Sequence, residues 1–123
     1  MKIKVLPQEF SVCKVKDFSE VDLNRDFFFM SKTDDENSVV CPTEFVPENT
    51  TDRSDGWRAF RIIGMLDFSL IGILAKIANI LAKNNIGLFA VSTYNTDYIL
   101  TKAESFDKAV TLLEEAGYRQ IIS

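Results

Sequence analysis

The sequence predicts an α+β fold, on three observations. Short segments rich in Val and Phe alternate with polar joints over the first half of the chain, which is typical of β-strands. After the polar stretch at residues 47–56, apolar residues recur at three- and four-residue intervals in two places, which indicates two amphipathic helices. Alternating apolar segments next to these helices predict further strands.

The length of 123 residues fits one domain or two small lobes. The chain is 46% hydrophobic and 26% charged, as ordinary globular proteins are, and ten Phe provide bulky side chains for a core. The stretch PENTTDRSDG at 47–56 combines Pro, Asn, Asp and Gly, and it marks a boundary. We therefore expect a strand-rich lobe at residues 1–48, a linker at 49–56 and a second domain at 57–123.

The individual elements follow from the same patterns. In the first half, strands are predicted at residues 2–6, 10–15, 27–32 and 38–43, and residues 17–24 form a single helical turn at most. In the second half, the predicted order is a strand at 56–64, a helix at 69–84, strands at 86–93 and 97–102, a helix at 105–117 and a final strand at 119–122.

Both predicted helices have recognisable ends. Asp67 or Ser69 can cap the first helix, and Asn84, Asn85 and Gly87 tolerate the left-handed conformation at its end. Its apolar stripe is Leu70, Ile73, Leu74, Ile77, Ile80 and Leu81, with Lys76, Asn79 and Lys83 on the solvent side. In the second helix Ser105 is the predicted cap, Gly117 the stop, and the inward residues are Ala109, Leu112, Leu113 and Ala116.

From residue 56 onward the order is β-α-β-β-α-β, the ferredoxin-like arrangement. It predicts a four-stranded antiparallel sheet with both helices on one face. The opposite sheet face then carries Leu, Phe and Val without a helix to cover them, so we expect it to pack against a second sheet or another subunit.

Charge and hydropathy exclude several classes of function. Eighteen acidic against fourteen basic side chains give a net charge of -4, so the field of the protein repels phosphate backbones and we expect no nucleic-acid partner. No apolar run approaches the roughly 18 to 20 residues that a membrane helix needs, and the start of the chain lacks a signal-peptide core. These features predict a soluble, cytoplasmic protein without a membrane partner.

The chain offers no catalytic motif. It has no His, which removes the commonest general base and excludes a Ser-His-Asp triad. Cys13 and Cys41 are too few for a zinc site, so no metal or cofactor is expected; each fits a small buried hydrophobe, with a disulfide or a reactive thiol as alternatives. Asp67 and Asp97 are the one acidic pair that could share a site, and no nucleophile accompanies them. We therefore expect a non-enzymatic protein.

Three stretches carry a family resemblance: VVCPTEFVPE at 39–48, the continuous segment 56–102 and the closing helix. FSLIGILA followed by STYNTDYIL is the specific pair of motifs within them. Together they resemble the ACT-domain family and, within it, stand-alone proteins similar to the CASTOR arginine sensors and the regulatory ACT pairs of aspartokinases. For residues 1–38 the resemblance implies a degenerate ACT-like lobe.

The resemblance also implies a function and a site. It implies that a free amino acid binds between two ACT units of a homodimer, held by the first turn of a helix and by the loop after the next strand. The corresponding residues here are Ser69, Leu70, Ile71, Gly72, Ile73, Ser92, Thr93, Tyr94, Asn95, Thr96 and Asp97.

The physical chemistry of these residues agrees with a zwitterionic ligand. A helix N-terminus exposes unpaired N–H groups that suit an α-carboxylate, and Gly72 allows close approach or tight packing. Asp97 would neutralise the α-ammonium group. Two simpler interpretations stay open: Asp97 is a turn-forming residue, and the hydroxyls of the bend satisfy strand ends. The sequence thus predicts an amino-acid sensor, with a ligand-independent interaction module that docks on a metabolic enzyme as the alternative.

Overall fold

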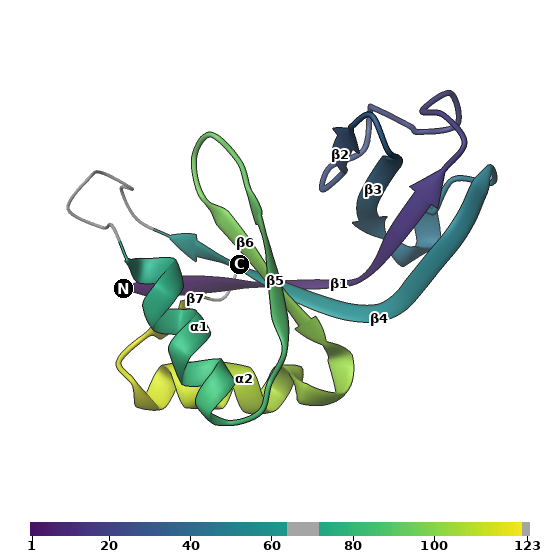
Figure 1. The fold of residues 1–123 in the computed structure, drawn as a ribbon. Coiled ribbons are helices and arrows are strands. Elements are labelled where there is room, and N and C mark those ends of the chain that lie inside the picture. Colours follow the sequence, from purple (N-terminus) through teal and green to yellow (C-terminus); the bar gives the residue numbers. More distant parts are fainter. Residues whose placement is uncertain (64–71, 122–123) are drawn as a thin grey trace. The chain divides into compact units, whose positions relative to one another are not determined.

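The computed structural model describes residues 1–63 and 72–121, and it has the predicted α+β composition (Figure 1). The elements in chain order are β1 (Lys2–Val15), β2 (Phe29–Lys32), β3 (Asn37–Pro42), a 3-10 turn (Thr43–Phe45), β4 (Thr50–Ile63), α1 (Ile73–Lys83), β5 (Leu88–Ser92), β6 (Asp97–Lys102), α2 (Ala103–Glu115) and β7 (Arg119–Ile121).

The chain forms two compact units. Met1–Pro7 together with Arg58–Ser123 make one, here called the helical unit, and Gln8–Trp57 make the other, the strand unit. The long strands β1 and β4 contribute residues to both units. The extents differ from the predicted lobes in one important respect, because the first seven residues belong with the second half of the chain.

The strand unit has the same order of strands as the β-α-β-β-α-β arrangement, but other segments stand in the places of the two helices. In it, β3 pairs antiparallel with β1, from Phe10 opposite Pro42 to Lys14 opposite Ser38, and β2 pairs antiparallel with β3. A loop occupies residues 16–28, where the helical unit has α1, and the short 3-10 turn stands where it has α2. This is the degenerate ACT-like lobe that the family resemblance implied.

Residues 17–24 contain turns and no helix, which is within the predicted limit of a single helical turn at most. Asp17 and Asp22 each fold back on their own backbone, and their carboxylates accept hydrogen bonds from the N–H groups of Ser19 and Asn24, both at 3.0 Å. Such local side-chain bonds compete with helix formation, so the segment consists of turns.

The prediction of a linker at 49–56 is wrong, since nearly all of this segment is strand. β4 starts at Thr50, and β1 runs without a break through the exposed Pro7. The main chain explains the difference: the Lys16 N–H donates to the carbonyl of Asn49 at 3.2 Å, and the Thr51 hydroxyl donates to the carbonyl of Lys14 at 3.2 Å. Pairing with a partner strand stabilises this polar segment, whose side chains are mostly exposed.

Within residues 1–63 and 72–121, the sheet of the helical unit has five strands, not the predicted four. β5 and β6 form an antiparallel hairpin, β6 lies next to β4, and β4 lies next to β1. The last strand, β7, pairs in parallel with β1, from Lys2 opposite Arg119 to Lys4 opposite Ile121. The start of the chain therefore adds a strand, which the prediction omitted because it took the sheet only from residues after 56.

The helix ends are partly as predicted. Gly72 is the N-cap of α1, and the proposed caps Asp67 and Ser69 lie outside the described residues. Asn85, at φ 60°, supplies the left-handed residue after α1. In α2 the cap assignment to Ser105 is wrong, because the helix begins at Ala103, directly after the last residue of β6.

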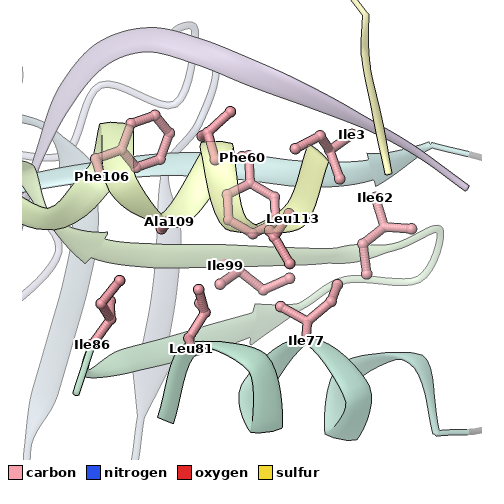
Figure 2. Packing of buried hydrophobic residues seen from close by; sticks show 11 residues of the cluster. Ile3, Phe60, Ile62, Ile77, Leu81, Ile86, Ile99, Phe106, Ala109 and Leu113 are labelled. Atoms are coloured by element: carbon pink, nitrogen blue, oxygen red, sulfur yellow. The ribbon is translucent and has the colours of Figure 1, made fainter. Parts of the chain in front are cut away.

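One hydrophobic cluster holds both helices against the same face of this sheet, as predicted (Figure 2). The sheet contributes Ile3, Phe60, Ile62 and Ile99, and the helices contribute Ile77, Leu81, Phe106, Ala109, Val110 and Leu113, joined by Ile86. Burying a side chain such as that of Leu81 contributes about 1.5–3 kcal/mol. Ala116, expected to face inward, is exposed because α2 turns its Phe106–Val110–Leu113 stripe to the sheet instead.

Candidate functional site

The polar bend between β5 and β6 is held by its own hydroxyl groups. The N–H and the hydroxyl of Thr93 both donate to the carbonyl of Thr96, at 2.8 and 3.0 Å. The Thr93 hydroxyl oxygen in turn accepts the N–H of Thr96 at 3.3 Å. The hydroxyl of Thr93 thus satisfies main-chain groups of the bend, as one of the simpler interpretations expected, and any ligand contact would come in addition to these bonds.

A second bond fixes the bend to the neighbouring strand. The Thr96 side chain is 9% exposed, and its hydroxyl donates to the carbonyl of Ile62 at 2.7 Å. Ile62 is the penultimate residue of β4, the strand that leads toward α1. Thr96 thus ties the bend to the end of β4.

The remaining side chains of the bend point to solvent or pair locally. The Ser92 hydroxyl donates to Oδ1 of Asp97 at 2.6 Å, across the last residue pair of the β5–β6 hairpin. Tyr94 is fully exposed and Asn95 is exposed. Asp97 is half-buried, and the bond from Ser92 uses only one of its two carboxylate oxygens.

The start of α1 explains Gly72 in a way that the sequence did not suggest. Gly72 has φ 94°, a left-handed conformation that L side chains rarely adopt, and a Cβ built there would meet no described atom within 4 Å. Tight packing is therefore not the reason for a glycine at this position. The backbone conformation requires it, and the space in front of it is open with respect to the described residues.

The structure brings most of the predicted site residues into one unit. Gly72 and Ile73 begin α1, and residues 92–97 form the bend, all within the helical unit. Ser69, Leu70 and Ile71 lie outside the described residues.

The same bend chemistry recurs in the strand unit, between β2 and β3. There the N–H and hydroxyl of Thr33 donate to the carbonyl of Glu36, and the Thr33 hydroxyl oxygen accepts the N–H of Glu36 at 3.0 Å. The Ser38 hydroxyl donates to the Glu36 carboxylate, as Ser92 does to Asp97. A threonine four residues before the first residue of the next strand is thus a turn signal in both halves of the chain.

Cys13 and Cys41 are both buried free thiols on the paired strands β1 and β3. A hydrogen bond from Cys41 lowers the pKa of Cys13, helped by the nearby Arg53 and opposed by burial. The same contact, together with burial, raises the pKa of Cys41 far above its usual range. The expectation of buried, hydrophobe-like cysteines is confirmed, and Cys13 is the more acidic thiol of the two.

Sequence reasoning missed a buried polar chain in the strand unit. Ser11 is fully buried, and its hydroxyl donates to Oδ1 of Asp55 at 2.5 Å. Since that uses its only proton, the Thr43 hydroxyl donates to Ser11 across their 2.9 Å contact. Arg53 pairs with the same Asp55 oxygen at 3.0 Å. The visible signal was a serine within the apolar run FSVCKV.

Among residues 1–63 and 72–121, no group of three or more His, Cys, Asp or Glu side chains is placed to hold a metal ion. None of the described helices is long and apolar enough to cross a membrane.

The helical unit has a ferredoxin-like α+β fold. A family model described as the ACT domain matches residues 52–115, just over half of the chain. The chain therefore belongs to the ACT domain family, whose members are in general regulatory, ligand-binding modules. No curated protein sequence matches it.

Solved structures agree with this assignment. Protein Atu0741 from Agobacterium tumefaciens is similar over 99% of this chain and 92% of its own, with 28% identity and a TM-score of 0.86. The ligand-free regulatory subunit of aspartate kinase from Thermus thermophilus is similar over 95% of this chain and 97% of its own, with 10% identity and a TM-score of 0.67. Aspartate kinase from Clostridium acetobutylicum, described as an allosteric enzyme, has 17% identity and a TM-score of 0.65 over 89% of this chain and 33% of its own. The likeness to both aspartate kinases is one of fold.

Proposed function

We propose that this chain is a non-enzymatic regulatory protein of the cytoplasm that binds a free amino acid between ACT units of a homodimer. The observation that carries the proposal is the start of α1, which no side chain of the described residues caps. The first bond within the helix runs from the N–H of Lys76 to the carbonyl of Gly72 at 2.9 Å. The N–H groups before Lys76 have no partner within the helix, and Gly72 has no side chain with which to cap them.

The charge at this helix start favours an anionic group. The first turn of α1 carries no acidic residue, whereas the first turn of α2 carries Glu104. An acidic side chain near a helix N-terminus partly compensates the positive end of the helix dipole. In α1 no acidic residue of the first turn compensates that end, and the α-carboxylate of an amino acid has the required charge and acceptor geometry.

The bend supplies the opposite charge. Asp97 follows the bend in the same unit, and Thr96 fixes its position by the bond to Ile62. One carboxylate oxygen of Asp97 accepts from Ser92, which orients the group for a charge-assisted bond to an α-ammonium. Among the described residues, the proposed ligand contacts are Gly72, Ile73 and residues 93–97. The family resemblance adds Ser69 and Ile71.

The similar structures support regulation by a ligand. One is the regulatory subunit of an aspartate kinase, described as a ligand-free form, and another is an aspartate kinase described as an allosteric enzyme. A regulatory module acts by binding one of two conformations more tightly, so a bound amino acid would change the shape of the dimer or its affinity for a metabolic enzyme.

Calorimetric titration with each of the twenty amino acids tests the proposal. At least one should bind, and Asp97→Ala should weaken it by about 2–5 kcal/mol if the paired ammonium is buried. Glu36→Ala is the matched control, because Glu36 is also a carboxylate at a hairpin bend that accepts from a serine. Absence of binding by all twenty, or equal loss in both variants, would refute the proposal.

A second candidate is a ligand-independent dimerisation module that docks on a metabolic enzyme. The observation in its favour is that the hydroxyls of Ser92, Thr93 and Thr96 are all used within the protein. For such a module, Asp97→Ala leaves self-association unchanged in sedimentation experiments and no amino acid raises the melting temperature.

A further inference from the structure

A pocket of about 400 Å³ lies in the helical unit, away from the bend, between α2 and the strands β1, β4 and β7. Its volume is within the usual range for small-molecule sites, roughly 300–1,000 Å³. The polar residues that line it are Arg58, Asp107, Thr111, Glu114 and Gln120. Three of them, at 107, 111 and 114, repeat at helical spacing and so share one stripe of α2.

Arg58 places a positive charge at the inner side of this pocket. Its guanidinium lies over the ring of Phe106, 4.6 Å from the centroid, and one terminal nitrogen donates to the carbonyl of Leu6 at 3.3 Å. A guanidinium has five N–H donors; the Nε of Arg58 is buried and without a hydrogen-bond partner among the described residues, so the donors that can reach a ligand in the pocket are those of the terminal nitrogens. Stacking on Phe106 holds the planar group in one orientation, ready for a carboxylate.

Two negative charges stand at the outer side. Asp107 and Glu114 are exposed residues of α2 that line the same pocket. Within the described part of the chain, neither forms an ion pair with Arg58 within 4.0 Å. The pocket therefore has a cation on one side and two carboxylates on the other, and these charges do not neutralise one another by direct contact.

This arrangement selects the charge type of a ligand. The two outer carboxylates repel phosphate and other dianions, and the guanidinium of Arg58 repels simple cations. A small molecule with a carboxylate at one end and an ammonium at the other satisfies both sides, because Arg binds carboxylates in a two-point manner and Asp or Glu accepts from ammonium. The Thr111 hydroxyl and the Gln120 amide can each donate or accept a further bond.

We propose that this pocket is a second amino-acid site, which binds a zwitterion with its carboxylate on Arg58 and its ammonium on Asp107 and Glu114. Apolar side chains of Val5 and Val110 line the rest of the pocket and suit the aliphatic part of such a ligand. The site shares no residue with the bend or with the start of α1, so a protein with both sites would bind amino acids at two separate places.

NMR titration of the full chain tests the proposal, with the methyl signals of Val5 and Val110 and the side-chain amide of Gln120 as reporters. The probes are the twenty amino acids, acetate, methylamine and inorganic phosphate. At least one amino acid should shift all three reporters in a saturable way, with acetate, methylamine and phosphate binding at least tenfold more weakly. Phosphate binding as tightly as the amino acid would overturn the assignment of ligand class.

The variants separate this site from the bend. Asp107→Asn combined with Glu114→Gln changes only exposed side chains and should weaken binding tenfold or more at these reporters. Asp97→Ala should leave the same titration unchanged. Arg58→Lys keeps the charge but removes the two-point contact, and it should also weaken binding. No saturable shift with any amino acid, or unchanged affinity in the Asp107/Glu114 double variant, would overturn the proposal.

Discussion

Thr96→Val tests how the bend between β5 and β6 is held. Valine keeps the shape of threonine but replaces the hydroxyl with a methyl group, so the carbonyl of Ile62 loses the donor that now lies 2.7 Å away. The backbone bonds between Thr96 and Thr93 remain possible in the variant. The substitution therefore removes one buried side-chain bond and little else.

The burial of this bond sets the expected magnitude. Thr96 is 9% exposed and Ile62 is 2% exposed, so water cannot readily replace the lost donor. Leaving a buried acceptor without a partner costs about 1–3 kcal/mol. With an m-value of about 2 kcal/mol/M, a loss of about 2 kcal/mol lowers the urea midpoint by about 1 M.

Far-UV circular dichroism measures the effect in the right part of the protein, because α1 and α2 both belong to the helical unit. Thr96→Ser is the control, since it retains the hydroxyl and loses only a methyl group. A Thr96→Val protein with the midpoint of the original, or a serine variant as unstable as the valine variant, would show that the bond to Ile62 does not stabilise the fold.

Three further substitutions test other parts of the structure. Leu81→Ala, at a fully buried position, should cost about 2–5 kcal/mol in urea unfolding, whereas the exposed Lys76→Ala should stay within about 0.5 kcal/mol. Gly72→Ala places a Cβ at φ 94° and should lower stability by about 1–2 kcal/mol; an unchanged melting curve would contradict the strained conformation. Bonds from Ser19 lower the pKa of Asp17, so in an NMR titration Ser19→Ala should raise that pKa toward 3.8. Because the folded pKa of Asp17 is depressed, its contribution to stability is present above the unfolded pKa and is lost as pH falls through the folded one.

The second half of the chain could be predicted well because its signals are local. The apolar spacing from Ile73 to Leu81 depends only on the helical period, and the hairpin around Thr93 follows from turn-forming residues between two alternating segments. Helix starts were predicted less well. In α2 the chain passes from strand to helix at Lys102 without a capping side chain, so no residue type marks the start.

The first half could not be predicted as well because its strands depend on distant partners. The polar residues 50–56 form strand only because β1 offers main-chain groups to pair with, and no local pattern shows that partner. The fifth strand of the helical unit has the same origin, since Lys2–Lys4 pair with a segment more than a hundred residues away. The position of Arg58 over Phe106 likewise arises from tertiary packing, which no local pattern predicts.

The discontinuity of the helical unit bears on how this chain can be divided. The span matched by the family, residues 52–115, omits Met1–Pro7 and therefore the fully buried Ile3. A fragment cut to that span loses both β7 and the strand β1 with which it pairs, and it opens a hole in the core. The strand unit is encoded by one contiguous stretch, codons 8–57, which separates the two coding stretches of the helical unit, so the helical unit cannot be exchanged or fused as a single contiguous segment.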